Sequence, residues 1–219
     1  MEDVFKIIDE RKEVYLDWLV RLCRQPSIAA QNVGMAETAQ LVQELISGIG
    51  ATPRLIPTNG YPVVFSEILG ESDRTIAFYD HYDVQPADPL DLWESDPFEP
   101  VIRDGTLYAR GVSDNKGNLV ARLAAVDAFQ RARGRLPVNV KFIFEGEEEI
   151  GSPNVDAFAE SGVAEDEPGV RHVQVPLGAD DGERATGLHV VVERGNDHVL
   201  SRHGDASQTQ PAGLGRPAM

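Results

Sequence analysis

The sequence predicts an α/β fold in which a mixed, mostly parallel sheet is flanked by helices. Two observations predict this class. Apolar runs of strand length alternate with segments whose apolar residues recur at helical spacing, as in layered α/β proteins. In addition, the clusters richest in carboxylates and histidine follow directly after strand-like runs, which is where such sheets place their ligand sites.

The first 50 residues predict two amphipathic helices, at residues 4–23 and 35–49. Gln25 and Pro26 end the first, because the residue before a proline disfavours helical geometry. Gly48 or Gly50 ends the second. The next hundred residues alternate between the two kinds of element. We expect strands at residues 51–57, 63–69, 75–79, 106–110 and 138–144, a helix at 118–133, and a helix that starts near 153–160.

Composition excludes several classes of partner. The 219 residues carry 36 acidic and 20 basic side chains, a formal net charge of −16, which argues against nucleic-acid binding. No apolar run approaches the ~18 residues needed to span a bilayer, and the amino-terminal residues do not resemble a signal peptide, so we expect no membrane association. Cys23 is the only cysteine and falls in an apolar helical pattern, which indicates a small core residue and is compatible with a reducing cytoplasm.

The character of the sequence changes near residue 161. From there to residue 219 the chain contains no Phe, Trp, Tyr, Ile or Lys, although it contains four of the five histidines. A short strand at 187–193 is the one element expected there. We therefore divide the chain into residues 1–160, which form the folded part, and residues 161–219, a tail of low aromatic content that is disordered or translated out of frame.

Three clusters can carry chemistry. Glu145 and the run Glu147-Glu148-Glu149 place four carboxylates within five positions after an apolar strand, so either solvent or a cation must offset their repulsion. His81 and Asp83 lie two residues apart at another strand end, where their side chains share a face. Asp114 precedes a helix, a position at which aspartate is also an ordinary N-cap. One histidine with several carboxylates fits a hard or borderline divalent ion.

The residues around these clusters carry a family resemblance. They are His81-Tyr82-Asp83-Val84-Gln85-Pro86, then Gly111-Val112-Ser113-Asp114-Asn115-Lys116-Gly117, and last Glu145-Gly146-Glu147-Glu148-Glu149-Ile150-Gly151-Ser152. In this order and spacing the sequence resembles the M20 family of metallopeptidases over about residues 1–160. The loop at residues 85–104, with Trp93 and Phe98, favours the dipeptidase branch, which includes the cytosolic and carnosine-type dipeptidases.

The resemblance implies the amino-terminal part of a zinc-peptidase-like catalytic domain that hydrolyses dipeptides or related amides. It implies two Zn²⁺ ions, with Mn²⁺ or Co²⁺ as alternatives. His81, Asp114 and Glu149 are then metal ligands, Asp83 orients His81, and Glu148 is the general base. The implied substrate is a small peptide or an N-acyl amino acid. Glu147 receives no role.

The sequence also departs from the family pattern. Asp80 stands where the family usually has glycine. The lid domain through which the family homodimerises, a further acidic ligand and a final histidine ligand are not identifiable, although Asp180 or Asp181 lies at a tolerable separation for the acid. Two alternatives therefore stay open: a non-catalytic remnant that binds metal weakly, and an M20 amidohydrolase of the deacylase or desuccinylase type.

Overall fold

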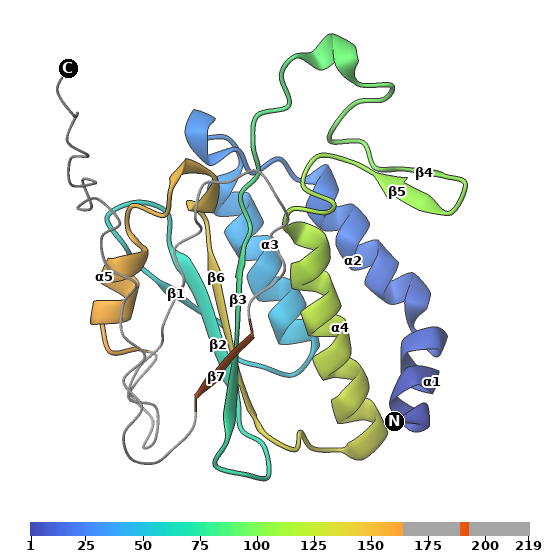
Figure 1. Cartoon of the computed structure of the whole chain (residues 1–219), viewed down its shortest axis with the longest axis vertical. Helices are drawn as coiled ribbons and strands as arrows, with labels where there is room; N and C mark the ends of the chain where they lie inside the picture. Colours follow the sequence, from blue (N-terminus) through green and yellow to red (C-terminus); the bar gives the residue numbers. More distant parts are fainter. Residues whose placement is uncertain (164–188, 193–219) are drawn as a thin grey trace, which may run out of the picture.

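The computed structural model describes residues 1–163 in full and the backbone of residues 189–192. One five-stranded sheet, in the order β1-β2-β6-β3-β7, forms the centre of the molecule. Helices α1 to α4 lie on one face of the sheet, and the short helix α5 lies on the other (Figure 1). The prediction of an α/β fold with a mixed sheet flanked by helices is confirmed.

The element bounds follow the predicted ranges closely. The α-helices are α1 Glu2–Glu10, α2 Lys12–Arg24, α3 Met35–Gly48, α4 Lys116–Arg133 and α5 Val155–Glu160. The 3-10 helices are η1 Ala29–Gln31, η2 Leu90–Leu92 and η3 Glu148–Ile150. The sheet strands are β1 Arg54–Ile56, β2 Val63–Ile68, β3 Thr75–His81, β6 Asn139–Glu145 and β7 His189–Val192, and a separate hairpin is formed by β4 Val101–Arg103 and β5 Thr106–Tyr108.

The direction of the strands corrects one detail of the prediction. We expected a mostly parallel sheet, but within the described residues only β3 and β6 pair in parallel, whereas β1–β2, β2–β6 and β3–β7 are antiparallel. The reason lies in the connections. Helix α4 crosses over between β3 and β6, as a parallel pair requires, but short loops join β1 to β2 and β2 to β3 and reverse the chain.

The predicted single helix at residues 4–23 is also corrected, because it is two helices separated at Arg11. The break coincides with a contact distant in sequence: the Nε of Arg11 and the hydroxyl of Tyr15 each donate to the carboxylate of Asp127 in α4, both at 2.9 Å. Asp127 is only 3% exposed, and Arg131 donates to it as well. This buried charge network fastens α1 and α2 to the carboxyl-terminal half of α4.

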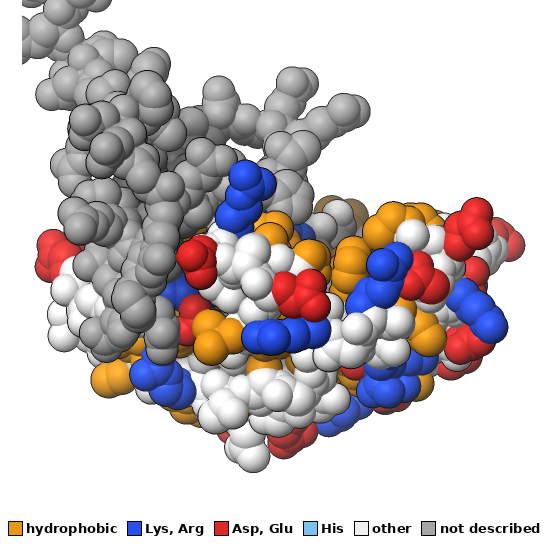
Figure 2. Space-filling view, turned by 90° about the horizontal axis from the view of Figure 1, so that it is seen from below, with side chains coloured by type: hydrophobic (Ala, Val, Ile, Leu, Met, Phe, Trp, Pro, Cys, Tyr) orange, Lys and Arg blue, Asp and Glu red, His pale blue; other side chains and the backbone are white. Residues whose placement is uncertain are grey.

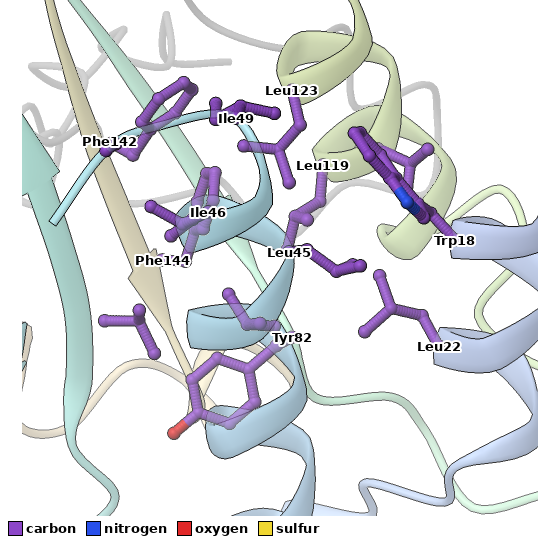
Figure 3. Packing of buried hydrophobic residues seen from close by; sticks show 14 of the residues in the cluster. Trp18, Leu22, Leu45, Ile46, Ile49, Tyr82, Leu119, Leu123, Phe142 and Phe144 are labelled. Carbon is purple, nitrogen blue, oxygen red and sulfur yellow. The ribbon is translucent and has the colours of Figure 1, made fainter. Parts of the chain in front are cut away.

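Strand β6 is buried on both faces, as its apolar run predicted. Phe142 and Phe144 point into the larger core, and Ile143 points to the other face. Figure 3 shows the larger core, a single cluster that contains the two phenylalanines and side chains of α2, α3 and α4, among them Trp18, Leu22, Ile46, Leu119 and Leu123. On the other face, Phe158 of α5 covers a smaller cluster with Phe65 and Ile143.

Cys23 is fully buried, in agreement with the prediction of a small core residue. No helix in the described residues combines the length and apolar character needed to cross a bilayer. The lower end of the molecule in Figure 1 is seen directly in Figure 2, where acidic and basic side chains alternate with small hydrophobic areas. The carboxyl ends of β3 and β6 lie at the opposite end (Figure 1).

Candidate metal centre

The parallel pairing of β3 and β6 brings two of the three predicted clusters together. In the register of these strands, His81 lies beside Glu145, so both strands end at the same edge of the sheet. Asp83 follows the end of β3, and η3, with Glu148 and Glu149, follows the end of β6. Asp114 reaches the same place from the turn that leads into α4.

The imidazole of His81 is the centre of this arrangement. It is 3% exposed, and its Nδ1 lies 3.1 Å from the carbonyl oxygen of Asp83 and 3.3 Å from the Asp83 carboxylate. Because a carbonyl oxygen can only accept, Nδ1 carries a proton. Nε2 lies 3.0 Å from Oδ1 of Asp114 and 3.7 Å from Oε2 of Glu148. The ring nitrogen of His81 that could bind a metal, Nε2, therefore faces two carboxylates.

These carboxylates change the basicity of the ring. Burial lowers the pKa of His81, but hydrogen bonds to Asp114 and Asp83 and the charge of Glu148 outweigh burial and raise the pKa to about 10. In the metal-free chain a proton on Nε2 thus neutralises part of the negative charge. The same contact lowers the pKa of Asp114. A cation in this place would take over the role of that proton.

Asp83 joins the two strand ends. Its carboxylate is fully buried and accepts hydrogen bonds from the backbone N–H groups of Glu148 at 3.3 Å and Glu149 at 3.0 Å, in addition to its contact with His81. One side chain therefore fixes the orientation of the imidazole and the position of η3. A carboxylate behind a histidine ligand is the usual way in which metal sites hold the ring.

The structure brings the three predicted metal ligands into one group. One donor atom each from His81, Asp114 and Glu149 lie within 4.8 Å of one another. Two donors on the same zinc ion are about 3.0–3.4 Å apart, from metal–ligand distances of ~2.1 Å. The 3.0 Å between His81 and Asp114 fits that range. Burial raises the pKa of Glu149, although a hydrogen bond from Gln85 at 2.8 Å opposes the increase.

The charge balance of the group also fits a cation. Asp83, Asp114, Glu148 and Glu149 contribute four carboxylates, and His81 is the one cationic side chain in ion-pair contact with any of them among residues 1–163. Clustered carboxylates without a counter-charge are costly. Imidazole and carboxylate donors together suit Zn²⁺ and related divalent ions. The residues present therefore fit a divalent metal.

Each predicted site residue can now be located. His81, Asp83, Asp114, Glu148 and Glu149 come together, while their catalytic and ligand roles stay predictions. The N-cap interpretation of Asp114 is wrong, because Asn115 occupies the N-cap position of α4. The suggestion of Asp180 or Asp181 as a further ligand lies outside the described residues.

Glu147, which had no predicted role, is buried and turned away from His81. Asn154 donates to both of its carboxylate oxygens, at 3.1 and 2.9 Å. Glu145 is also buried, and it accepts hydrogen bonds from Ser152 at 2.7 Å and from Tyr79. The hydrogen bonds of Glu145 with Ser152 and of Glu147 with Asn154 hold the turn that carries Glu148 and Glu149. These contacts could not be predicted from the sequence, because nothing in it distinguishes the four carboxylates of the turn from one another.

Other residues near the site were not assigned by sequence reasoning. Gln85 donates to the carboxylate and the carbonyl of Glu149, and it was visible only as part of the motif that begins at His81. Lys116 is completely buried and donates to the carbonyls of Leu22 and Gln25 at the end of α2. It anchors the start of α4, two residues after Asp114. Burial lowers the pKa of Lys116 to about 8.

The fold and the site define an α/β domain with a candidate divalent-metal centre at the carboxyl ends of two parallel strands. Residues 77–203 match the sequence profile of peptidase family M20/M25/M40. The chain belongs to this family. The matched range extends beyond residue 160, where we placed the end of the resemblance.

Known proteins of the same family are similar to the chain over most of its length. Human Beta-Ala-His dipeptidase is 35% identical over 177 residues, which cover 73% of this chain and 35% of that protein. The crystal structure of human carnosine dipeptidase 1 has a TM-score of 0.68 at 33% identity, with 74% of this chain and 38% of that chain covered. An M20 family metallo-carboxypeptidase from Sulfolobus solfataricus has a TM-score of 0.66 at 41% identity, with 69% and 35% covered. The chain thus spans about a third of the length of these relatives.

Proposed function

We propose that this chain contributes to a metal-dependent site that hydrolyses dipeptides or related amide bonds. The observation that carries the proposal is the group formed by His81, Asp114 and Glu149, whose donor atoms lie within 4.8 Å of one another. Membership of the peptidase family and the similarity to dipeptidases support it. The relatives' names also support small peptides, and by extension N-acyl amino acids, as the substrate class.

We further propose that the site takes two Zn²⁺ ions, with Mn²⁺ or Co²⁺ as alternatives. The family resemblance makes Asp114, which lies beside His81, the candidate for a ligand that both ions would share. His81 would then serve one ion and Glu149 the other. When bound, such ions act as Lewis acids toward the scissile carbonyl and the attacking water.

The remaining roles belong to side chains of this chain. Asp83 holds the His81 ring and the η3 backbone in place. Glu148, with its carboxylate 3.7 Å from Nε2 of His81 and partly open to solvent, is suited to general-base catalysis. Glu148 takes a proton from water as the water oxygen bonds to the amide carbon. It then delivers that proton to the leaving nitrogen as the carbon–nitrogen bond breaks.

A second reading is metal binding without turnover. A four-coordinate zinc site needs three or four protein ligands, and the described residues supply three donors for two ions. The chain also spans about a third of its relatives. An incomplete ligand set binds metal more weakly and holds the water less firmly. This reading keeps the site and removes the catalysis.

We assign the chain to the cytoplasm, on the basis of its single buried cysteine. We also propose that residues 1–160 are part of the catalytic domain and that residues 161–219 are a separate tail. Translation of the coding DNA in the other two frames tests whether that tail is out of frame. Family-like sequence in either frame would support this origin, and its absence from both would exclude it. Dimerisation through a lid domain, as in the family, would require chain beyond these 219 residues.

The test is the zinc content and the dipeptide hydrolysis of the purified 219-residue chain, with Glu148→Gln and Glu147→Gln compared. Both variants remove one charge from the same turn, but Glu147 contacts Asn154 rather than His81. If the enzyme proposal is correct, two ions bind, Glu148→Gln abolishes hydrolysis and Glu147→Gln retains most of it. Metal binding without hydrolysis would favour the second reading. Absence of tightly bound metal together with absence of hydrolysis would contradict the enzyme proposal and likewise favour the second reading.

A further inference from the structure

A buried ion pair lies directly behind the candidate metal centre. Asp80 precedes His81 in β3 and is fully buried, and its Oδ2 lies 3.0 Å from Nε of Arg122 in α4. Because successive strand residues point to opposite faces, Asp80 faces α4 while His81 faces away from it. Arg122 is itself held by α4, since it donates to the carbonyl of Asn118 at 3.3 Å and stacks over Phe78. The pair therefore links the carboxyl end of β3 to the first half of α4.

This ion pair and the contact between His81 and Asp114 connect the same two parts of the chain, the end of β3 and the start of α4. Asp80 is the covalent neighbour of His81, and Asp114 lies two residues before the start of α4. The turn from Asp114 into the helix is closed by a hydrogen bond from the N–H of Lys116 to the carbonyl of Gly111 at 3.0 Å. Any shift of the strand end relative to α4 must change the 3.0 Å separation of His81 and Asp114.

We propose that Asp80 and Arg122 are a positioning pair that sets the separation of His81 and Asp114 and thereby the affinity of the site for metal. The proposal rests on the metal site proposed above. Neither residue touches the ligand atoms, so both act through the backbone segments that carry His81 and Asp114.

Loss of one member of the pair is expected to cost more than loss of both, because each buried charge compensates the other. The contact between Oδ2 of Asp80 and Nε of Arg122 is not an aligned hydrogen bond, so electrostatic attraction across 3.0 Å is the main compensation for the buried carboxylate, with smaller contributions from His81 and the Asn115 side chain. Removal of Arg122 alone leaves a buried carboxylate that must move or take up a proton. Removal of both charges leaves nothing to be compensated. The single variant should therefore disturb the end of β3, whereas the double variant should resemble the wild type.

The experiment compares three variants of the full chain: Arg122→Met, the double variant Asp80→Asn/Arg122→Met, and Asp127→Asn as a matched control. Asp127 is a buried carboxylate in the same helix, but it is paired with Arg11 at the other end of α4. The first measurement is the NMR signal of the His81 imidazole in the metal-free chain, assigned with His81→Gln. The second is zinc affinity by competition with a chromophoric chelator.

Arg122→Met should shift the His81 signals and weaken zinc binding by about 10- to 100-fold, the usual effect of losing a residue that supports a metal ligand. The double variant should recover both to near the wild-type values. Asp127→Asn should lower stability and leave both unchanged. If Arg122→Met does not fold, Asp80→Asn replaces it, because Arg122 is 11% exposed and can turn toward solvent, and a smaller change in the same direction is expected.

Wild-type His81 signals and zinc affinity in Arg122→Met would overturn the proposal, as would equal changes in Asp127→Asn. Failure of the proposed metal site is distinguishable, because the wild-type chain would then bind no zinc, and failure of hydrolysis alone leaves both measurements intact. The NMR comparison does not depend on metal. It still supports positioning if Arg122→Met shifts the His81 signals and Asp127→Asn does not, and it overturns positioning if neither does.

Discussion

Replacement of Asp83 by asparagine is the most direct test of how the site is held. The substitution keeps the shape of a fully buried side chain and removes its charge. It also exchanges one acceptor oxygen for an NH₂ group that can only donate. Around this position the structure offers only donors: the backbone N–H groups of Glu148 and Glu149 and the Nδ1–H of His81.

The magnitude follows from the two orientations of the amide. If the NH₂ group replaces Oδ2, it faces the N–H of Glu149; if it replaces Oδ1, it faces the N–H of Glu148 and the imidazole of His81. Either orientation leaves at least one buried donor unpaired, which costs about 1–3 kcal/mol. Loss of the charge that supports the protonated His81 adds to this. We expect Asp83→Asn to lower the free energy of unfolding by about 2–4 kcal/mol.

The assay is urea denaturation of the metal-free chain, followed by zinc titration of the folded protein. Asp127→Asn is the control, because it neutralises a carboxylate that is equally buried and equally surrounded by donors, Arg11 and Tyr15 among them. We expect both variants to lose stability. Only Asp83→Asn should also lose zinc affinity, by about 10- to 100-fold.

Two results would refute this reasoning. If Asp83→Asn unfolds within about 0.5 kcal/mol of the wild type, the hydrogen bonds to η3 do not contribute as described. If instead it loses stability like Asp127→Asn but binds zinc as tightly as the wild type, Asp83 supports the fold without orienting His81.

Three further predictions concern the surroundings of the site. A Cβ at Gly146 would overlap the buried ring of Tyr82, so Gly146→Ala should cost about 1–3 kcal/mol in urea denaturation, whereas Gly48→Ala, where a Cβ meets nothing, should be neutral or stabilising. Burial raises the pKa of Glu145 from 4.5 to about 7, so the folded chain binds this proton more tightly than the unfolded chain. Stability should therefore fall by at most about 3 kcal/mol as the pH rises from 4.5 to 7, and Glu145→Gln should remove that part of the slope in urea titrations at several pH values. Phe158→Ala should cost about 3–5 kcal/mol in the same assay, because Phe158 is buried against the sheet; a cost below ~1 kcal/mol would mean that α5 is not docked there.

The fold shows which structural features the periodicity of a sequence can predict and which it cannot. Strand β6 was predictable because Phe142, Ile143 and Phe144 form one apolar run, and the structure buries them on both faces. The break between α1 and α2 was not, because Ile8 and Tyr15 on either side of it are two helical turns apart and share one face, and because the break coincides with pairing of Arg11 to Asp127, more than a hundred residues away. The prediction of a mostly parallel sheet was wrong for a similar reason, because the placement of β6 between β2 and β3 depends on tertiary contacts.

The candidate site shows the same difference between local sequence pattern and tertiary contact. His81, Asp83, Asp114 and Glu149 could be grouped from the sequence, because each follows a strand-like run or precedes a helix and their order resembles a known family. Their supporting contacts could not. Gln85 was part of a recognised motif, but nothing in the sequence indicated that its amide binds Glu149.

Arg122 is the clearest example of a contact that could not be predicted from the sequence. In the sequence Arg122 is one of several arginines on an amphipathic helix, and nothing there indicates its partner. Asp80 was recognised only as a departure from the family pattern, in which glycine is usual. The structure pairs the two residues, so the charge of Asp80 is compensated from the helix side of the sheet. The departure at position 80 therefore changes how the strand end is held more than it changes the charge that faces the metal site.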